Sequence, residues 1–144
     1  MNMTIYLVSC VSQKAATAKP AKDLYLSNWF RKAKAYILRT LRAQDRWFIL
    51  SAKHHLVSPE TLLLPYEATL LQMTQPERKE WARRVTAQIL SISTNRDSVV
   101  ILAGKHYREF MIPNLEAEGY QIKVPMKGLG IGRQLAWLSQ KTAR

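Results

Sequence analysis

The fold is decided by the stretch Trp47-Phe48-Ile49-Leu50-Ser51-Ala52-Lys53-His54-His55-Leu56-Val57-Ser58-Pro59-Glu60. Its first four residues are large and apolar, which predicts a strand that is buried on both faces of a sheet. The chain then changes to small and polar residues, from Ser51 to His55. Ligands of open α/β sheets lie outside the carboxyl ends of the strands, so we expect a functional loop at this point.

Other apolar runs predict three more strands, at Ile5–Val8, Ser98–Ala103 and Tyr120–Val124. Helical segments alternate with them. We expect a helix from Ser27 to about Ala43, and one that opens at Thr74–Glu77 with Pro76 at the first helical position. A third should follow Arg108 up to Glu118, with Gly119 as the stop, and a fourth should run from the Gly128–Gln134 loop through Leu138. This order predicts a single α/β domain over residues 1–144, a three-layer fold with a mainly parallel four-stranded sheet flanked by helices.

The composition excludes several classes of protein. The chain of 144 residues is 47% hydrophobic and 22% charged, as in a soluble globular domain, and no apolar run reaches the roughly 20 residues of a membrane span. We expect a cytoplasmic protein, because no signal peptide is recognisable and the single cysteine allows no intrachain disulfide. The net charge of +12 favours nucleic acid or a nucleotide as partner over a role in solubility alone.

In a parallel sheet the loops that follow all four strands meet at one edge. These loops are Ser9–Lys14, Ser51–His55, Gly104–Arg108 and Lys127–Gln134. Glycines at 128, 130 and 132 precede a helix and allow backbone N–H groups to approach an anion, to which Arg133 adds charge. A flexible turn explains the three glycines equally well. With Lys14, Lys105 and Arg108 they are the candidate phosphate contacts.

The candidate catalytic residues are Lys53, His54 and Glu67. Lys53 would act as a phosphate contact or, if desolvated, as a Schiff-base nucleophile. Of the neighbours His54 and His55, at most one is expected to face the site as an acid, base or donor. Glu67 stands out because other acids, such as Asp45 and Asp97, lie in turns; a positioned carboxylate can act as a base or stabilise a sugar cation, although a surface role remains the alternative. We expect no metal and no cofactor.

Six motifs together resemble the DUF6884 family of bacterial and phage proteins over nearly the whole chain. They are Leu7-Val8-Ser9-Cys10 with Lys14, Asp23-Leu24-Tyr25 with Ser27, Leu50-Ser51-Ala52-Lys53-His54, Leu64-Pro65-Tyr66-Glu67, Leu102-Ala103-Gly104-Lys105 with Tyr107-Arg108, and Pro125 with Gly128-Leu129-Gly130-Ile131-Gly132-Arg133-Gln134. This family is distantly similar to the peroxide-stress DNA-binding family and to the uracil-DNA-glycosylase-like fold, and relatives occur beside genes for deazaguanine modification of nucleic acid.

The resemblance implies binding of a nucleobase or nucleotide, and cleavage of an N-glycosidic bond in phage defence or DNA repair. The residues that would contact the base or nucleotide are Ser9, Cys10, Ser51, Tyr66, Tyr25 and Gln134, with Trp29 as a further stacking candidate. The family usually has glycine where this chain has His55, so His55 either adopts a conformation that suits glycine or reshapes the floor of the pocket.

Three functions follow from these observations. The first is a DNA-glycosylase-like enzyme that acts on a modified or damaged base, with DNA expected ahead of RNA. The second is a noncatalytic module that recognises modified or damaged DNA. The third is a nucleoside hydrolase or deoxyribosyltransferase for small molecules, which the net charge of +12 disfavours because a free nucleoside needs no basic surface. The sequence leaves the oligomeric state open.

Overall fold

The structure, a computed structural model, describes residues 2–143. Its main sheet has five strands in the order β4-β3-β1-β6-β7. Their bounds are Thr4–Ser9 (β1), Arg46–Ser51 (β3), His55–Val57 (β4), Ser98–Leu102 (β6) and Gln121–Lys123 (β7). β1 pairs in parallel with β3 and β6, and β6 pairs in parallel with β7. The four expected strands and the α/β class are therefore confirmed.

β1 occupies the centre of the sheet because both of its edges carry a parallel neighbour. Ile5 lies opposite Arg46 on one side and opposite Val99 on the other. Ile5, Leu7 and Val8 are fully buried, as expected for a strand covered on both faces. The stretch that starts at Trp47 forms β3, one strand away from the centre.

The expected count of four strands is one short, because β4 pairs antiparallel with the end of β3. Its three residues are too few to show an apolar or alternating pattern in the sequence. The chain reverses through a tight turn so that His55 pairs with Ser51. His55 has φ 66°, the left-handed conformation that favours glycine, so the first of the two alternatives for this residue holds. A separate two-stranded sheet joins β2 (Lys19–Pro20) to β5 (Leu62–Leu63).

Two long helices begin where the sequence predicts. In α2 (Asn28–Thr40) the hydroxyl of Ser27 accepts a hydrogen bond from the backbone N–H of Phe30, at 3.0 Å. In α3 (Gln75–Ile92) Thr74 and Glu77 form a capping box, which satisfies two N–H groups at the helix start. The remaining helices are α1 (Ala21–Leu24), the 3-10 turn η1 (Leu70–Gln72), α4 (Lys105–Arg108), α5 (Met111–Ala117) and α6 (Ile131–Thr142).

The helix expected up to Glu118 is α5, and a short additional helix, α4, lies within the expected Gly104–Arg108 loop. Pro113 keeps the two helices apart, because it lacks an N–H group and its ring would clash with the carbonyl of Glu109 in a continuous helix. Pro113 lies in the first turn of α5, where a proline is tolerated. Gly119, with φ 92°, follows this helix as expected.

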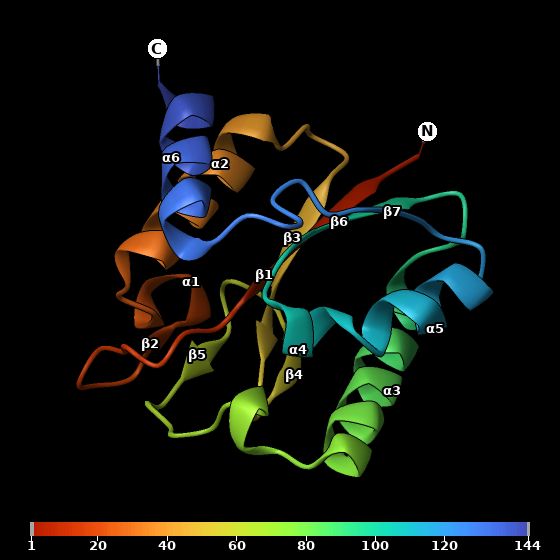
Figure 1. Cartoon of the computed structure of the whole chain (residues 1–144), viewed down its shortest axis with the longest axis horizontal. Coiled ribbons are helices and arrows are strands. Elements are labelled where there is room, and N and C mark those ends of the chain that lie inside the picture. The colour runs from red at the N-terminus through yellow and green to blue at the C-terminus, as the bar shows by residue number, and fades with distance from the viewer. Residues whose placement is uncertain (1, 144) are drawn as a thin grey trace.

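The helices pack in two pairs, α2 against α6 and α3 against α5, at separate places around the sheet (Figure 1). Apolar stripes on these helices supply the core, with Phe30 and Ile37 from α2 and Trp81 and Ile89 from α3 all buried. Leu38 is 53% exposed because it lies one residue off the buried face of α2. The three-layer order of the elements stays a prediction.

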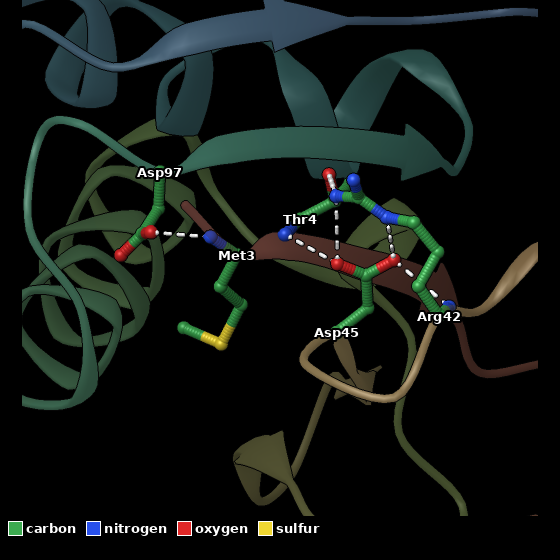
Figure 2. A network of polar contacts seen from close by, with 5 residues as sticks. All are labelled: Met3, Thr4, Arg42, Asp45 and Asp97. Atoms are coloured by element: carbon green, nitrogen blue, oxygen red, sulfur yellow. Dashed lines mark hydrogen bonds and ion pairs between the residues drawn. The ribbon is translucent and has the colours of Figure 1, made fainter. Parts of the chain in front are cut away.

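Two buried carboxylates hold the amino end of β1 (Figure 2). Asp45 accepts a hydrogen bond from the backbone N–H of Thr4 at 2.9 Å, and its oxygens lie 2.9 and 3.0 Å from Nε and Nη2 of Arg42. Asp97 accepts a hydrogen bond from the N–H of Met3 at 2.8 Å. These acids therefore satisfy backbone groups and fix the start of the central strand.

Candidate functional site

The four parallel strands bring their following loops to the carboxyl edge of the sheet, as the topology requires. A cavity of about 560 Å³ opens there, and we call it the Trp29 cavity. Its lining residues are Ser9, Cys10, Val11, Ser12, Ser27, Trp29, Ala68, Thr69, Leu71, Gly104, Lys105, His106, Tyr107, Ile131 and Gln134. They come from the loops after β1 and β6, from the starts of α2 and α6, and from the segment before α3.

Trp29 is held in the wall of this cavity by Gln134. The indole N–H donates to Oε1 of Gln134 at 2.8 Å, and Nε2 of Gln134 donates to the carbonyl of Leu129 at 2.8 Å. Both ends of the Gln134 amide are thus engaged within the protein. The contact ties α2 to the start of α6 and fixes the plane of the indole, so that an aromatic surface is available to a planar ligand.

Cys10 and Tyr107 form part of the floor. The Cys10 thiol lies 3.2 Å from the hydroxyl of Tyr107 and accepts a hydrogen bond from the N–H of Ala52 at 3.4 Å. Burial raises the pKa of Tyr107, and proximity to Cys10 adds to that shift, so the phenol stays protonated at neutral pH. Cys10 is 6% exposed and lines the cavity, so only a small part of its surface is open to a ligand.

Three residues for which the resemblance implies base binding form hydrogen bonds with one another through their hydroxyl groups. The hydroxyl of Tyr66 lies 2.6 Å from that of Tyr25 and 2.7 Å from that of Ser51, which also accepts a hydrogen bond from the N–H of His54. We call Tyr25, Ser51 and Tyr66 the Tyr66 cluster. All three are buried; Tyr25 is 2% exposed and offers no face on which a base could stack. Burial raises the pKa of Tyr25 to about 12.

Cationic residues gather on the ring of Tyr66. Nζ of Lys14 lies 4.4 Å from the ring centroid and Nζ of Lys53 lies 5.9 Å from it. Burial lowers the pKa of Lys14, while Cys10 and Glu67 partly oppose that shift. Lys14 was expected to contact phosphate, and it lies here rather than in the lining of the Trp29 cavity.

The three candidate catalytic residues lie around Tyr66. The imidazole of His54 meets the Tyr66 ring edge-on at 5.2 Å, and burial together with the charge of Lys53 lowers the pKa of His54 below 6.5. Glu67 is exposed; it follows Tyr66 directly and precedes Ala68, which lines the Trp29 cavity. No acid is among the lining residues of that cavity within residues 2–143.

The candidate phosphate contacts divide into two groups. Lys105, Arg108 and Gly128 line a smaller, more enclosed cavity of about 190 Å³. Gly130 is the N-cap of α6, and Gly132 and Arg133 are exposed in its first turn. Gly128 has φ 83°, which a residue with a side chain rarely adopts, so a turn requirement accounts for at least this glycine.

A third cavity, of about 590 Å³, lies between the β3–β4 turn and α3, and sequence reasoning missed it. Lys53 and His55 form one side, and Trp81 and Arg84 from α3 contribute to the other. Burial lowers the pKa of His55, and the charge of Arg84 adds to the shift. The one signal in the sequence for unusual backbone geometry here was that the family it resembles usually has glycine where this chain has His55.

Metal-ligand clusters and membrane-spanning helices are both absent from the part of the chain that the structure describes. Within residues 2–143, no three His, Cys, Asp or Glu side chains come together as metal ligands would. None of the described helices combines the length and apolar character that a membrane span requires.

No curated protein and no solved structure matches this chain. One family model matches residues 5–140, which is nearly the whole sequence. That family is described as a family of unknown function, DUF6884. The chain belongs to the DUF6884 family.

Proposed function

We propose that the protein binds DNA, takes an unstacked base into the Trp29 cavity and hydrolyses the N-glycosidic bond of a modified or damaged base. One observation carries the proposal. A cavity of about 560 Å³, within the range of small-ligand sites, combines a fixed indole with Lys105 and has no acid in its lining within the described residues. An aromatic surface suits a base that has left the stack, and a cationic rim suits a phosphate backbone.

The net charge of +12 supports nucleic acid as the partner. The distant similarity to the peroxide-stress DNA-binding family and to the uracil-DNA-glycosylase-like fold, predicted from the sequence, points in the same direction. The cavity supports the proposal independently of these similarities between families.

Hydrolysis of the bond assigns a role to Glu67. The bond from C1′ to the base nitrogen breaks with its electron pair on the base, and a water oxygen joins C1′. One proton of that water passes to a carboxylate and then to the base nitrogen, so that the products are the free base and an abasic sugar. Glu67 lies next to the cavity wall at Ala68 and would stabilise the sugar cation or accept the proton. His54 is neutral at pH 7 and would position water or substrate through hydrogen bonds.

A noncatalytic module that recognises modified or damaged DNA is the second candidate. The observation that favours it is the exposure of Glu67 and its position outside the lining of the cavity. Recognition alone needs the indole and the cations but no positioned carboxylate.

The test incubates the purified protein with genomic DNA from phages that carry different base modifications, with plain and uracil-containing DNA as controls. Mass spectrometry detects released bases, and alkaline cleavage detects abasic sites. A released base, with abasic sites in equal number, supports the glycosylase. Intact DNA that is bound with an affinity falling steeply in salt supports the second candidate, and the absence of both release and binding contradicts the whole proposal.

A further inference from the structure

The small cavity of about 190 Å³ adjoins the Trp29 cavity. Gly104, Lys105 and Gln134 line both of them. Its volume corresponds to roughly six water molecules in the liquid, which suits a single tetrahedral anion and is too small for a nucleoside. Any group bound there would therefore be a substituent of a ligand that lies in the Trp29 cavity.

Arg108 lines this small cavity, and its Nε has no partner among the described residues. Its Nε atom is completely buried and makes no hydrogen bond to any described residue. Arg78 is the other half-buried arginine within residues 2–143, and its guanidinium pairs with Glu109 at 2.9 Å and with the carbonyl of Met73. A buried N–H donor without a partner is costly, so the contrast indicates that a ligand supplies the partner of the Arg108 Nε.

The rest of the lining suits an anion. Lys105 adds a second cation, and no acid lines the cavity within the described residues. Gly104 and Gly128 present only backbone to it, and the left-handed conformation of Gly128 shapes the turn from Val124 to Leu129. An arginine guanidinium binds phosphate oxygens in pairs, and a lysine adds a point charge.

We infer that the small cavity binds the phosphomonoester of a nucleotide whose base or sugar occupies the Trp29 cavity. Two cations match the charge of about −2 on a phosphomonoester better than the single charge of a phosphodiester. The more enclosed shape also suits a terminal phosphate, because a phosphodiester must leave room for a second ester chain. The inference rests on the proposed function and narrows its substrate to a phosphorylated DNA end; a free nucleoside monophosphate carries the same phosphate chemistry but would replace DNA as the substrate.

The experiment measures affinities by isothermal titration for short oligonucleotides that carry a 5′-phosphate, a 3′-phosphate or no terminal phosphate, and for deoxynucleoside 5′-monophosphates. For the wild-type protein we expect one phosphorylated ligand to bind at least about tenfold more tightly than the same molecule without the terminal phosphate, which we call its unphosphorylated twin. Arg108→Met and Lys105→Met should each remove most of that preference. Arg133→Met is the matched control, because Arg133 is exposed on α6 outside the cavity and its loss should weaken both twins alike.

Lys105 is exposed, so the Lys105→Met variant keeps the test valid even if Arg108→Met fails to fold. Tight binding of the mononucleotide would identify a free nucleotide as the ligand, whereas binding of the phosphorylated oligonucleotide alone would identify a DNA end. Equal affinity for phosphorylated and unphosphorylated twins overturns the inference and leaves the proposed function intact. Loss of binding to every oligonucleotide and nucleotide overturns both.

Discussion

At the amino end of the sheet the buried carboxylates have their partners, whereas at the carboxyl end Lys105 and Arg108 line cavities that have no acid among their described lining residues. Asp45 and Asp97 accept hydrogen bonds from the first residues of β1, and Arg42 adds an ion pair (Figure 2). Lys105 and Arg108, at the other end, form no ion pair within residues 2–143.

The difference separates stability from function. Polar groups that satisfy one another hold a fold together, while buried or clustered groups without partners mark places where a ligand completes the structure. Substitutions at the amino end should therefore lower the stability of the fold but leave ligand affinity unchanged. Substitutions at the carboxyl end should lower ligand affinity but change the stability little.

The largest expected effect is on catalysis at the carboxyl end. If the protein cleaves N-glycosidic bonds, Glu67→Gln should lower the rate of base release by about 10²- to 10⁴-fold while DNA affinity changes little, because glutamine keeps the size of the side chain but cannot accept a proton. Single-turnover release of the base and a DNA-binding titration measure the two quantities. Parallel loss of both, or an unchanged rate, would mean that Glu67 is not the catalytic carboxylate.

The next effect is on stability at the amino end. Asp45→Ala should lower the free energy of unfolding by about 2 to 4 kcal/mol, because the N–H of Thr4 and the guanidinium of Arg42 lose a buried partner. Urea unfolding measures the change. Asp23→Ala is the control, since the Asp23 carboxylate is 47% exposed and lies 3.7 Å from Lys34, a surface pair worth under about 1 kcal/mol. Equal costs for the two variants would contradict the distinction between the ends.

The indole of Trp29 should contribute to the affinity for DNA but little to the stability of the fold. Trp29→Leu is expected to weaken binding of single-stranded DNA by about 1 to 3 kcal/mol, because a stacked base loses its platform. Fluorescence anisotropy of labelled DNA measures this effect. Trp137→Leu is the matched control: Trp137 packs on Tyr36 at 5.0 Å, outside the cavity lining, and its loss should affect the melting temperature rather than DNA affinity.

Low pH should remove the stability that the Asp45 carboxylate gives to the amino end of the sheet. Burial by itself would raise the pKa of Asp45, but the hydrogen bonds from Arg42 and from the N–H of Thr4 outweigh it and hold the pKa below the ordinary value of 3.8. A lowered pKa gives stability that is fully present above about pH 4 and is lost as the pH falls through the folded-state value.

The matching experiment compares urea midpoints of the wild-type protein and of Asp45→Asn between pH 6 and the acid limit of folding. The stability advantage of the wild type should be constant down to about pH 4 and shrink below it, because asparagine does not titrate. An advantage that stays constant into strong acid would show that the charge of Asp45 contributes nothing.

The parallel strands could be predicted because continuous apolar runs such as Trp47–Leu50 and Ser98–Ala103 carry a strong local signal. β4 could not, because three residues of an edge strand depend on the β3 edge for pairing and not on their own pattern. The short helix α4 could not be predicted either, because its four residues are too few to show a helical period of apolar residues.

The site was predictable only as a set of loops. Parallel topology places Ser9, Ser51, Gly104 and Gln134 at one edge, but distances across that edge depend on packing that no single stretch encodes. Tyr25 and Tyr66 were interpreted as stacking residues, yet a partner 41 positions away turns them into a buried hydroxyl pair. Nothing in the sequence indicated that Arg108 would lie half-buried without an acid.

The smallest expected effect concerns the backbone of His55, the one non-glycine residue with positive φ within residues 2–143. An L-residue in that conformation costs roughly 1 to 2 kcal/mol, which glycine avoids, although glycine is more flexible in the unfolded chain. His55→Gly should therefore be more stable than His55→Ala by about 1 kcal/mol, as measured by urea unfolding. Both variants lose the imidazole, so their difference isolates the backbone.

If alanine proves as stable as glycine, the strain at His55 is absent, and the histidine then serves only as a wall of the cavity beside α3. If glycine is more stable, this chain retains a destabilising residue at the carboxyl end of the sheet, as expected where function and not stability selects the residue.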